Sequence, residues 1–320
     1  MDGPSGLDRN RRHGLKDLMN EALSFDHSDV GPHGTAVAIS PLVRRLVAPN
    51  GGPFTFTGTC SYLVGNEELV IIDPGPESDA HFDALVAAIG TATVSGLLVT
   101  HTHKDHSPLA RRLKALTGAP IIGCAPHWAA RALGAGEVNR LEASSDLDYV
   151  PDRVLGEGDV VEAKGLTLEA VPTPGHTMNH LAFALLQEKA LFSGDHVMAW
   201  STSIVAPPDG SMGAYMASLE RLMARDDAIY WPGHGGPVTE PARFVRGLLH
   251  HRRLRETTIA ERVAAGDRTI AAIVERLYSG LDPKLKGAAA LSVFAHLEEL
   301  VARGVVQTEG QARLDGEYWG

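Results

Sequence analysis

The stretch VSGLLVTHTHKDHSPLA, residues 94–110, joins an apolar run to a cluster of polar side chains. The cluster comprises His101, His103, Asp105 and His106. In an extended segment alternate residues project to the same side, so His101, His103 and Asp105 are expected to face one point, and the last histidine a second point. Imidazole nitrogens and carboxylate oxygens are the usual ligands of zinc and similar divalent ions. The stretch therefore predicts a metal site at the end of a strand.

One such loop supplies too few ligands for two metal ions, so the hypothesis requires further histidines or aspartates at the ends of other strands. Three later segments provide them: VPTPGHT contains His176, ALFSGDH contains Asp195, and AIYWPGHGG contains His234. If the strands that lead into these turns run the same way in one sheet, their ends meet at a single edge, where open α/β sheets commonly bind ligands. Each short turn alone would more often be a surface loop. The four motifs together favour a metal centre.

The order of patterns along the chain predicts an α/β protein. Apolar runs that read as strands alternate with amphipathic segments from about residue 36 to residue 240. Helical patterns then cover 241–266, 269–278 and 288–304, and two short strands are expected around Glu309 and Gly310, which is the outline of a winged helix-turn-helix. We therefore predict a flexible N-terminal extension over 1–35 with at most one short helix, a catalytic domain over 36–245 and a winged-helix domain over 246–320.

Composition limits the location and the partners of the protein. The 320 residues are 44% hydrophobic, which is typical of globular proteins, and no apolar run is long enough to span a membrane. The absence of a signal-peptide pattern, and two cysteines (Cys60 and Cys124) outside any CxxC pair, predict a cytoplasmic location. The net charge of −10 belongs wholly to residues 1–249, because residues 250–320 hold ten basic and ten acidic side chains. No long basic run indicates nucleic-acid binding.

The motifs THTHKDH, PGHT, SGD and PGHG resemble, in this order, the metal-binding motifs of the metallo-β-lactamase superfamily, over roughly residues 36–240. The resemblance implies an αβ/βα four-layer sandwich, with two sheets packed face to face between helices. It also implies two divalent metal ions, for which zinc, manganese and iron all suit the ligand types. It assigns His101, His103 and His176 to one ion, Asp105, His106 and His234 to the other, and Asp195 to both. The segment IIDPG is similar to a strand-turn of that family in which an aspartate, here Asp73, supports the ligands from behind.

The same resemblance implies that a hydroxide held between the two ions is the nucleophile, and that Asp105 orients it. Several sister families differ from this chain. Zinc β-lactamases usually have cysteine or another residue where Asp195 stands, flavodiiron proteins have glutamate where His103 stands, and quorum-signal lactonases place a tyrosine shortly after the bridging aspartate. Glyoxalase II has a different C-terminal domain. The segments YMASLERL and HHRRLRE, with the winged-helix pattern, resemble the lactamase-β-2-like family.

Three functions remain open at this point. The first is hydrolysis of a small thioester, ester or lactone, which the acidic catalytic domain favours. The second is a phosphodiesterase or endoribonuclease acting on single-stranded RNA, which the winged helix and the basic cluster Arg252, Arg253 and Arg255 favour. The third is a non-catalytic docking module, which the complete set of seven ligands disfavours. The winged helix would also suit a homodimer interface.

The remaining notable side chains receive weaker predictions. His180, His196 and Trp200 are candidates for lining the substrate site, the two histidines as substrate contacts or proton donors, and the two cysteines are expected to be packing residues. The other histidines are expected at the surface: His13, His27, His33, His81, His127, His250, His251 and His296.

Overall fold

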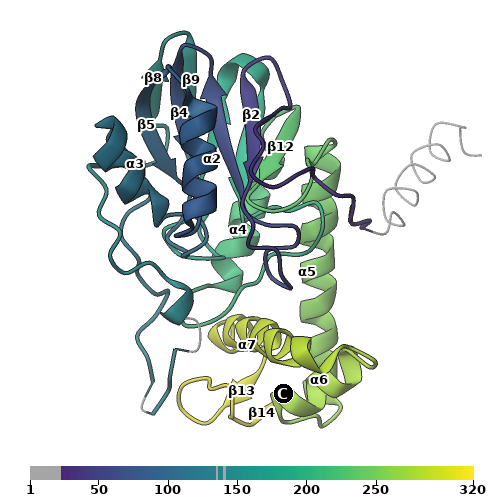
Figure 1. The fold of residues 1–320 in the computed structure, drawn as a ribbon. Helices are drawn as coiled ribbons and strands as arrows, with labels where there is room; N and C mark the ends of the chain where they lie inside the picture. Colours follow the sequence, from purple (N-terminus) through teal and green to yellow (C-terminus); the bar gives the residue numbers. More distant parts are fainter. Residues whose placement is uncertain (1–22, 135, 140–141) are drawn as a thin grey trace, which may run out of the picture.

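The computed structural model describes residues 23–134, 136–139 and 142–320. Two β-sheets pack face to face, helices cover their outer faces, and a smaller helical part follows at the C-terminal end (Figure 1). This is the predicted αβ/βα four-layer sandwich with an added C-terminal domain. Most of the predicted N-terminal extension, and its short helix, lie outside the described residues. Within the described ranges no helix is long and apolar enough to cross a membrane.

The first sheet has seven strands in chain order. They are β1 (Val37–Ala38), β2 (Val43–Val47), β3 (Cys60–Gly65), β4 (Glu68–Ile72), β5 (Thr93–Val99), β6 (Ile121–Gly123) and β7 (Arg153–Val154). The strands from β1 to β4 are antiparallel to their neighbours, whereas β4 to β7 run parallel. Helices α2 (Asp79–Ile89) and α3 (Leu109–Thr117) make the parallel crossovers. The α2 helix ends at Gly90 with a positive φ of 60°, as its sequence predicts.

The second sheet has five strands in the order β12-β11-β10-β9-β8. They are β8 (Val160–Ala163), β9 (Leu166–Pro172), β10 (Leu181–Leu185), β11 (Ala190–Gly194) and β12 (Ile229–Pro232). Because β10 is antiparallel to both β9 and β11, and β12 is parallel to β11, strands β9, β11 and β12 all run the same way. Helix α4 (Met212–Met223) connects β11 to β12 and packs against α5 (Pro241–Ala264).

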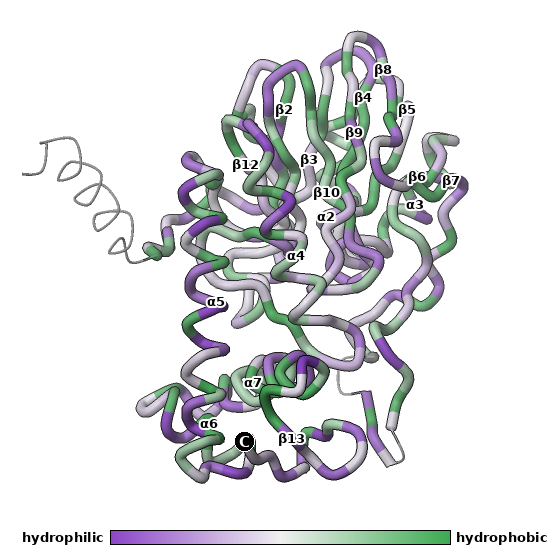
Figure 2. Tube along the Cα trace, turned by 180° about the vertical axis from the view of Figure 1, so that it is seen from behind, coloured by the Kyte–Doolittle hydropathy of each residue, from purple (hydrophilic) through white to green (hydrophobic). Residues whose placement is uncertain are grey.

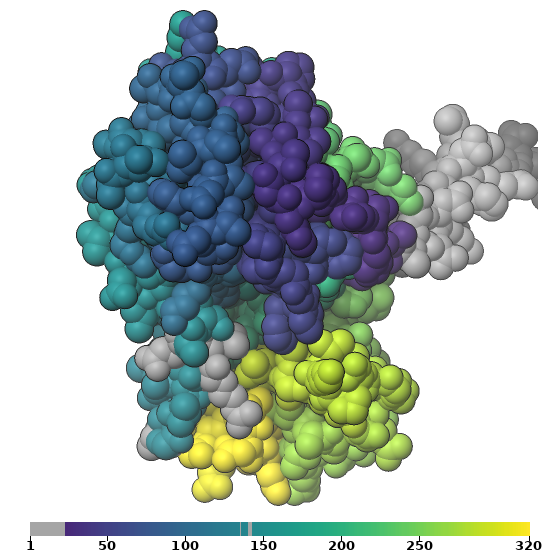
Figure 3. Space-filling model, in the orientation of Figure 1, coloured from purple at the N-terminus to yellow at the C-terminus, as the bar shows by residue number. Residues whose placement is uncertain are grey.

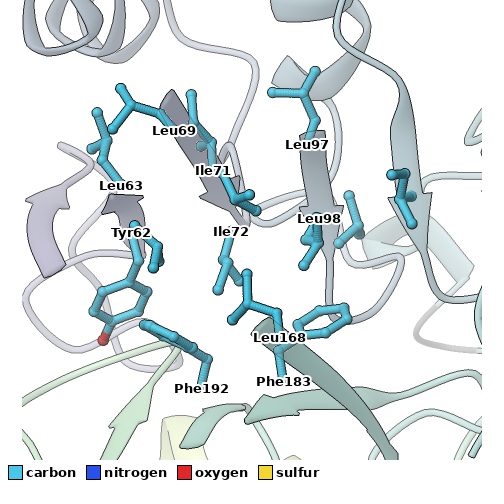
Figure 4. Packing of buried hydrophobic residues seen from close by; sticks show 14 of the residues in the cluster. Tyr62, Leu63, Leu69, Ile71, Ile72, Leu97, Leu98, Leu168, Phe183 and Phe192 are labelled. Atoms are coloured by element: carbon cyan, nitrogen blue, oxygen red, sulfur yellow. The ribbon is translucent and has the colours of Figure 1, made fainter. Parts of the chain in front are cut away.

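Side-chain alternation places the core on both faces of the second sheet. In β10 the side chains of Leu181, Phe183 and Leu185 enter the cluster between the two sheets, whereas Ala182 and Ala184 face the helices. Figure 4 shows residues of the first sheet meeting Phe183 and other residues of the second sheet in this cluster. The two-sided burial explains why the strands read as continuous apolar runs.

Helix α5 joins the sandwich to the C-terminal part, which also contains α6 (Ile270–Leu277), α7 (Lys286–Ala302), β13 (Gln307–Thr308) and β14 (Tyr318–Trp319). In the space-filling view this part forms a separate mass below the sandwich (Figure 3). Val245 and Leu248 near the start of α5 pack in the cluster of α4, and Ile259 and Val263 near its end pack in the C-terminal cluster. Figure 2 shows hydrophobic residues along the strands of the sandwich and a mixture along α5. The proposed domain division after residue 245 falls inside this helix, and that division stays a proposal.

The C-terminal hairpin corrects one prediction. Strands were expected directly on either side of Glu309 and Gly310, but β13 pairs with β14, which lies nearly ten residues further along. Tyr318 of β14 is fully buried in the C-terminal cluster, and its hydroxyl donates to the carbonyl of Arg313 at 2.5 Å. Burial of this aromatic ring therefore selects the pairing, and the intervening residues form a longer loop than the Glu309–Gly310 turn signal suggests.

Candidate metal centre

The candidate ligands meet at one end of the sandwich, where strands of both sheets end. His101, His103, Asp105 and His106 follow β5, His176 lies between β9 and β10, Asp195 follows β11, and His234 follows β12. The expectation that one edge of a single sheet carries them all is wrong, because β5 belongs to the first sheet and the other strands to the second. The sheets face each other, so the ends of their strands meet across the sandwich.

The seven side chains fall into two groups, and within each group the candidate ligand atoms lie within 4.8 Å of one another. The first group is His101, His103, His176 and Asp195, and the second is Asp105, His106 and His234. The expectation that Asp105 would face the same point as His103 in an extended segment is wrong. The chain turns there, because the N–H of His106 donates to the carbonyl of His103 at 3.0 Å. This turn carries Asp105 into the second group, which is the grouping that the resemblance implies.

The distances inside each group suit a tetrahedral divalent ion. In the first group His103 Nδ1 lies 3.1 Å from Nε2 of both His101 and His176. In the second group Asp105 Oδ2 lies 3.3 Å from His106 Nε2 and 3.2 Å from His234 Nε2. Ligand atoms about 2.1 Å from one tetrahedral zinc ion are about 3.4 Å apart. Both groups therefore fit such an ion.

Asp195 contacts both groups. Its Oδ2 lies 3.6 Å from His176 Nε2 and 3.4 Å from His234 Nε2, and its Oδ1 lies 3.5 Å from His106 Nε2. Asp195 Oδ1 and His106 Nε2 are both buried, and neither has a hydrogen-bond partner among the described residues. A buried polar atom without a partner is costly, so these two atoms fit a shared cation. A Cβ on Gly233 would lie 2.5 Å from Asp195 Oδ1, which explains the glycine of the PGHG turn.

Asp73 lies directly behind the second group. Its Oδ2 is 3.0 Å from His106 Nδ1, and its carboxylate also accepts from the N–H of Thr100 at 2.8 Å and from the Thr100 hydroxyl at 2.7 Å. Asp73 therefore lies behind a candidate ligand, where the resemblance suggested it would be. A carboxylate at Nδ1 fixes the imidazole tautomer and turns Nε2 toward the metal side.

Two backbone carbonyls support further ligands. The Ile204 carbonyl lies 2.6 Å from His176 Nδ1, and the Gly58 carbonyl lies 3.3 Å from His234 Nδ1. Both contacts orient the remaining Nε2 toward the candidate metal positions. Sequence reasoning missed both residues, because a carbonyl carries no side-chain signal.

Burial and neighbouring charges act against each other on the protonation of the candidate ligands. Burial favours the neutral form of each side chain, and a neighbouring opposite charge favours the ionised form. Burial lowers the pKa of His103 to about 3, which leaves its imidazole neutral and able to bind a cation. Burial also acts to lower the pKa of His234, but the carboxylates of Asp195 and Asp105 outweigh it and raise that pKa to about 9. Burial opposes ionisation of Asp195, yet its histidine neighbours hold its pKa well below the usual value. The carboxylates are thus ionised, as cation binding requires.

The three predicted substrate-lining residues lie in different places. His180 is buried behind the ligands, where its Nε2 accepts the N–H of Asp195 at 3.1 Å, and His196 is fully buried against Tyr215. Neither of these two histidines exposes a surface for direct substrate contact in this structure. Trp200 is partly exposed and stacks on Phe56 with ring centres 5.0 Å apart.

Other histidines also correct the sequence analysis. His81 and His296 were expected at the surface, but both are fully buried. His81 Nε2 lies 2.9 Å from the hydroxyl of Ser61, so a single polar partner is enough to place it inside. His127 is mostly buried, with Nε2 3.3 Å from Asp209 Oδ1. A histidine on an otherwise apolar helix or loop is therefore a poor surface marker here.

The comparisons with known proteins agree with this fold. The model of the Metallo-beta-lactamase superfamily matches residues 54–234, and that of the Beta-lactamase associated winged helix domain matches residues 269–319. An atrochrysone carboxyl ACP thioesterase of Aspergillus terreus is 28% identical over 250 residues, covering 77% of this chain and 71% of that protein. The Beta-lactamase-like protein 2 homolog of Caenorhabditis elegans is 26% identical over 276 residues, covering 84% and 87%.

Two solved structures share the fold across nearly the whole chain. A beta-lactamase domain protein from Burkholderia ambifaria has a TM-score of 0.75 at 24% identity and covers 93% of this chain and 97% of its own. A metallo-beta-lactamase family protein from Thermus thermophilus has a TM-score of 0.71 at 23% identity, covering 88% and 99%. Because the superfamily model matches more than half of its residues, the chain belongs to the metallo-beta-lactamase superfamily of hydrolases and carries the winged-helix domain associated with that superfamily.

Proposed function

We propose that the protein holds two divalent metal ions and hydrolyses a thioester, ester or lactone of a small molecule. The observation that carries the proposal is the shared position of Asp195, which contacts both ligand groups and faces the unpartnered Nε2 of His106. The five histidines and two aspartates suit zinc, and manganese or iron would also accept them.

Bound ions would supply a nucleophilic hydroxide near neutral pH and would polarise the scissile carbonyl oxygen. The chain itself supplies the proton acceptor. The side chain of Asp105 is 25% exposed, against 9% for Asp195, so Asp105 is the carboxylate that opens toward an arriving substrate. Burial opposes its ionisation, but His106 and His234 hold its pKa well below the usual value. The Thr59 hydroxyl donates to Asp105 Oδ2 at 3.1 Å, which leaves Oδ1 to orient the attacking water.

A carbonyl substrate has more support than a phosphodiester. The basic cluster that suggested RNA does not form a free basic surface: Arg252 is buried, and Arg253 forms an ion pair with Glu220 at 2.5 Å. The Arg255 guanidinium lies over the ring of Tyr278, 4.5 Å from its centre. Relatives named as thioesterases, with 28% and 30% identity, favour the same reading.

The loop that contacts the second ligand group carries aromatic side chains, which suit an acyl substrate. The ring of Phe56 stacks on Trp200. Phe56 lies two residues before Gly58, whose carbonyl faces His234. Phe54 in the same loop is 54% exposed. Aromatic rings bind apolar acyl groups better than a polyanionic strand.

A single assay series tests the proposal. The same metal-loaded preparation is given a thioester, a lactone, a bis-aryl phosphodiester and single-stranded RNA, with a His103→Ala preparation in parallel to expose contaminating activity. We expect the native protein to cleave the thioester or the lactone fastest, and the variant to cleave neither. Faster cleavage of RNA by the native protein alone would instead support the endoribonuclease, the alternative that the winged helix favours.

The proposal also includes a cytoplasmic location. Cys60 and Cys124 are both buried free thiols, and burial raises the pKa of Cys60 to about 11, so neither depends on an oxidising compartment. A homodimer through the winged-helix domain stays a prediction, which light scattering on the purified protein would test.

A further inference from the structure

Arg252 is a buried residue of the HHRRLRE segment, and the proposed reaction does not use it. It lies on α5 and is only 3% exposed, whereas its neighbour Arg253 lies at the surface. In the part of the chain that the structure describes, no carboxylate forms an ion pair with Arg252. A buried cation without a carboxylate is costly unless other polar groups hold it firmly. The contacts of the Arg252 guanidinium therefore indicate which parts of the fold it holds in place.

Three elements hold the guanidinium. Its Nη2 donates to the carbonyl of Ser203, and its Nη1 lies 3.4 Å from the hydroxyl of Ser292 on α7. The guanidinium also lies over the Tyr215 ring of α4, 5.1 Å from the ring centre. Arg252 thus connects the α5 and α7 helices to the loop that contains Ser203.

This loop supports a candidate metal ligand. Ile204, the next residue after Ser203, accepts from His176 Nδ1 through its carbonyl at 2.6 Å. Tyr215 packs closely against the turn that contains His176. A Cβ on Gly175, the residue before His176, would lie only 2.3 Å from the Tyr215 Cα. A fixed carbonyl at Nδ1 directs Nε2 of His176 toward His103 Nδ1, 3.1 Å away.

We propose that Arg252 is a positioning residue of the metal centre, which fixes the Ser203–Ile204 peptide and through it the orientation of His176. The helical C-terminal part then contributes to the first ligand group through this loop, although none of its residues is a ligand. The inference rests on the proposed metal occupancy. It replaces the role in RNA contact that the basic cluster suggested for Arg252.

Zinc binding measured without substrate tests this role. Metal-free native protein, Arg252→Met and the control Arg253→Met are titrated against a chromophoric chelator, and the two zinc dissociation constants are compared. We expect Arg252→Met to weaken one of the two constants about tenfold, in the range seen when supports of metal ligands are removed, and to leave the other unchanged. Arg253→Met should match the native protein, because the Arg253 side chain lies at the surface, where it pairs with Glu220. Native constants in a folded Arg252→Met protein would overturn the inference.

A double-mutant cycle shows whether Arg252 acts through His176. In a His176→Gln background, Arg252→Met should cause no further loss of zinc affinity at the affected site. If the losses of zinc affinity from the two substitutions add, the inference is contradicted. If thermal unfolding shows that Arg252→Met is unstable without metal, Arg252→Lys takes its place under the same criteria, because lysine keeps the charge but lacks the two separate nitrogens that contact Ser203 and Ser292. A native protein that binds none of zinc, manganese and iron would contradict the proposed function itself, whereas two bound ions with an unaffected Arg252 variant would contradict only this inference.

Discussion

His106 Nε2 lies 3.5 Å from Asp195 Oδ1, and both atoms are buried without a hydrogen-bond partner among the described residues. The two residues come from different sheets, 89 positions apart in the sequence. Such a pair of facing, unpartnered atoms is costly in a folded protein unless a third group lies between them. The proposed metal centre supplies that group, and the following predictions depend on it.

Replacement of Asp73 by alanine should weaken zinc binding without removing a ligand. The change leaves His106 Nδ1 and the N–H of Thr100 without their acceptor, so we expect about 10- to 100-fold weaker metal affinity and about 2–4 kcal/mol lower stability. Chelator competition and thermal unfolding measure the two effects. Asp73→Asn, which keeps an acceptor oxygen, should fall between the native protein and Asp73→Ala, and an Asp73→Ala protein with native zinc affinity would contradict the prediction.

A methyl group at Gly233 should displace the shared carboxylate. Its Cβ would lie 2.5 Å from Asp195 Oδ1 and 2.7 Å from His106 Cε1, so Gly233→Ala should lower the metal content while the fold persists. Gly287→Ala on α7 is the matched control, because a Cβ there meets nothing within 4 Å, and its stability should be unchanged or up to about 1 kcal/mol higher. Elemental analysis and circular dichroism would check both variants. Full metal content in Gly233→Ala would count against the geometry of the shared ligand.

The buried His81 should make the native protein sensitive to acid. Burial lowers its pKa from 6.5 to about 4, so the unfolded state binds the proton first. The stability contributed by neutral His81 is therefore present above pH 6.5 and is lost as pH falls toward 4, by about 3 kcal/mol in all. His81→Gln should lose less stability than the native protein over this range in denaturant titrations at several pH values. Equal slopes for His81→Gln and the native protein would refute the assignment, and His250→Gln, at an exposed position of α5, is the control.

The ring of Trp200 should bind the acyl part of the substrate. Trp200→Ala removes the partner of Phe56 beside the second ligand group, so we expect KM for an aryl or long-chain thioester to rise several-fold with native metal content. The exposed Leu186 precedes β11, at the opposite end of that strand from Asp195, and Leu186→Ala should leave KM unchanged. A fall in metal content in Trp200→Ala would show that the ring supports the ligands instead of the substrate.

The sequence was sufficient to predict most elements of the fold, because the apolar runs and their glycine turns are regular. The strand at the start of the 94–110 stretch and the long α5 helix follow their patterns closely. The second strand of the hairpin was misplaced, because burial of Tyr318 is a tertiary effect that a local turn signal does not contain. The division of the ligands between two sheets was also missed by reasoning from strand ends alone, since the pattern of a strand does not reveal its sheet.

Residue types predicted the candidate ligands but not the groups that hold them. Each of the seven side chains is a histidine or an aspartate in a recognisable turn, and the structure brings all seven together. The carbonyls of Gly58 and Ile204 belong to the backbone, so the residue types at these positions do not predict their contacts with the histidines. The basic cluster does not form a continuous basic surface, because Arg252 is buried, and its residue type alone does not indicate that burial.

The metal content of the purified native protein tests the central claim most directly. Elemental analysis, with Asp195→Asn measured beside it, should give about two divalent ions per native chain and fewer in the variant, because Asp195 contacts both ligand groups. The exposed Asp226, which pairs with Lys189 at the surface, provides the control Asp226→Asn, which should keep both ions. One ion or none in the native chain, or an unchanged count in Asp195→Asn, would contradict a dinuclear centre that shares Asp195.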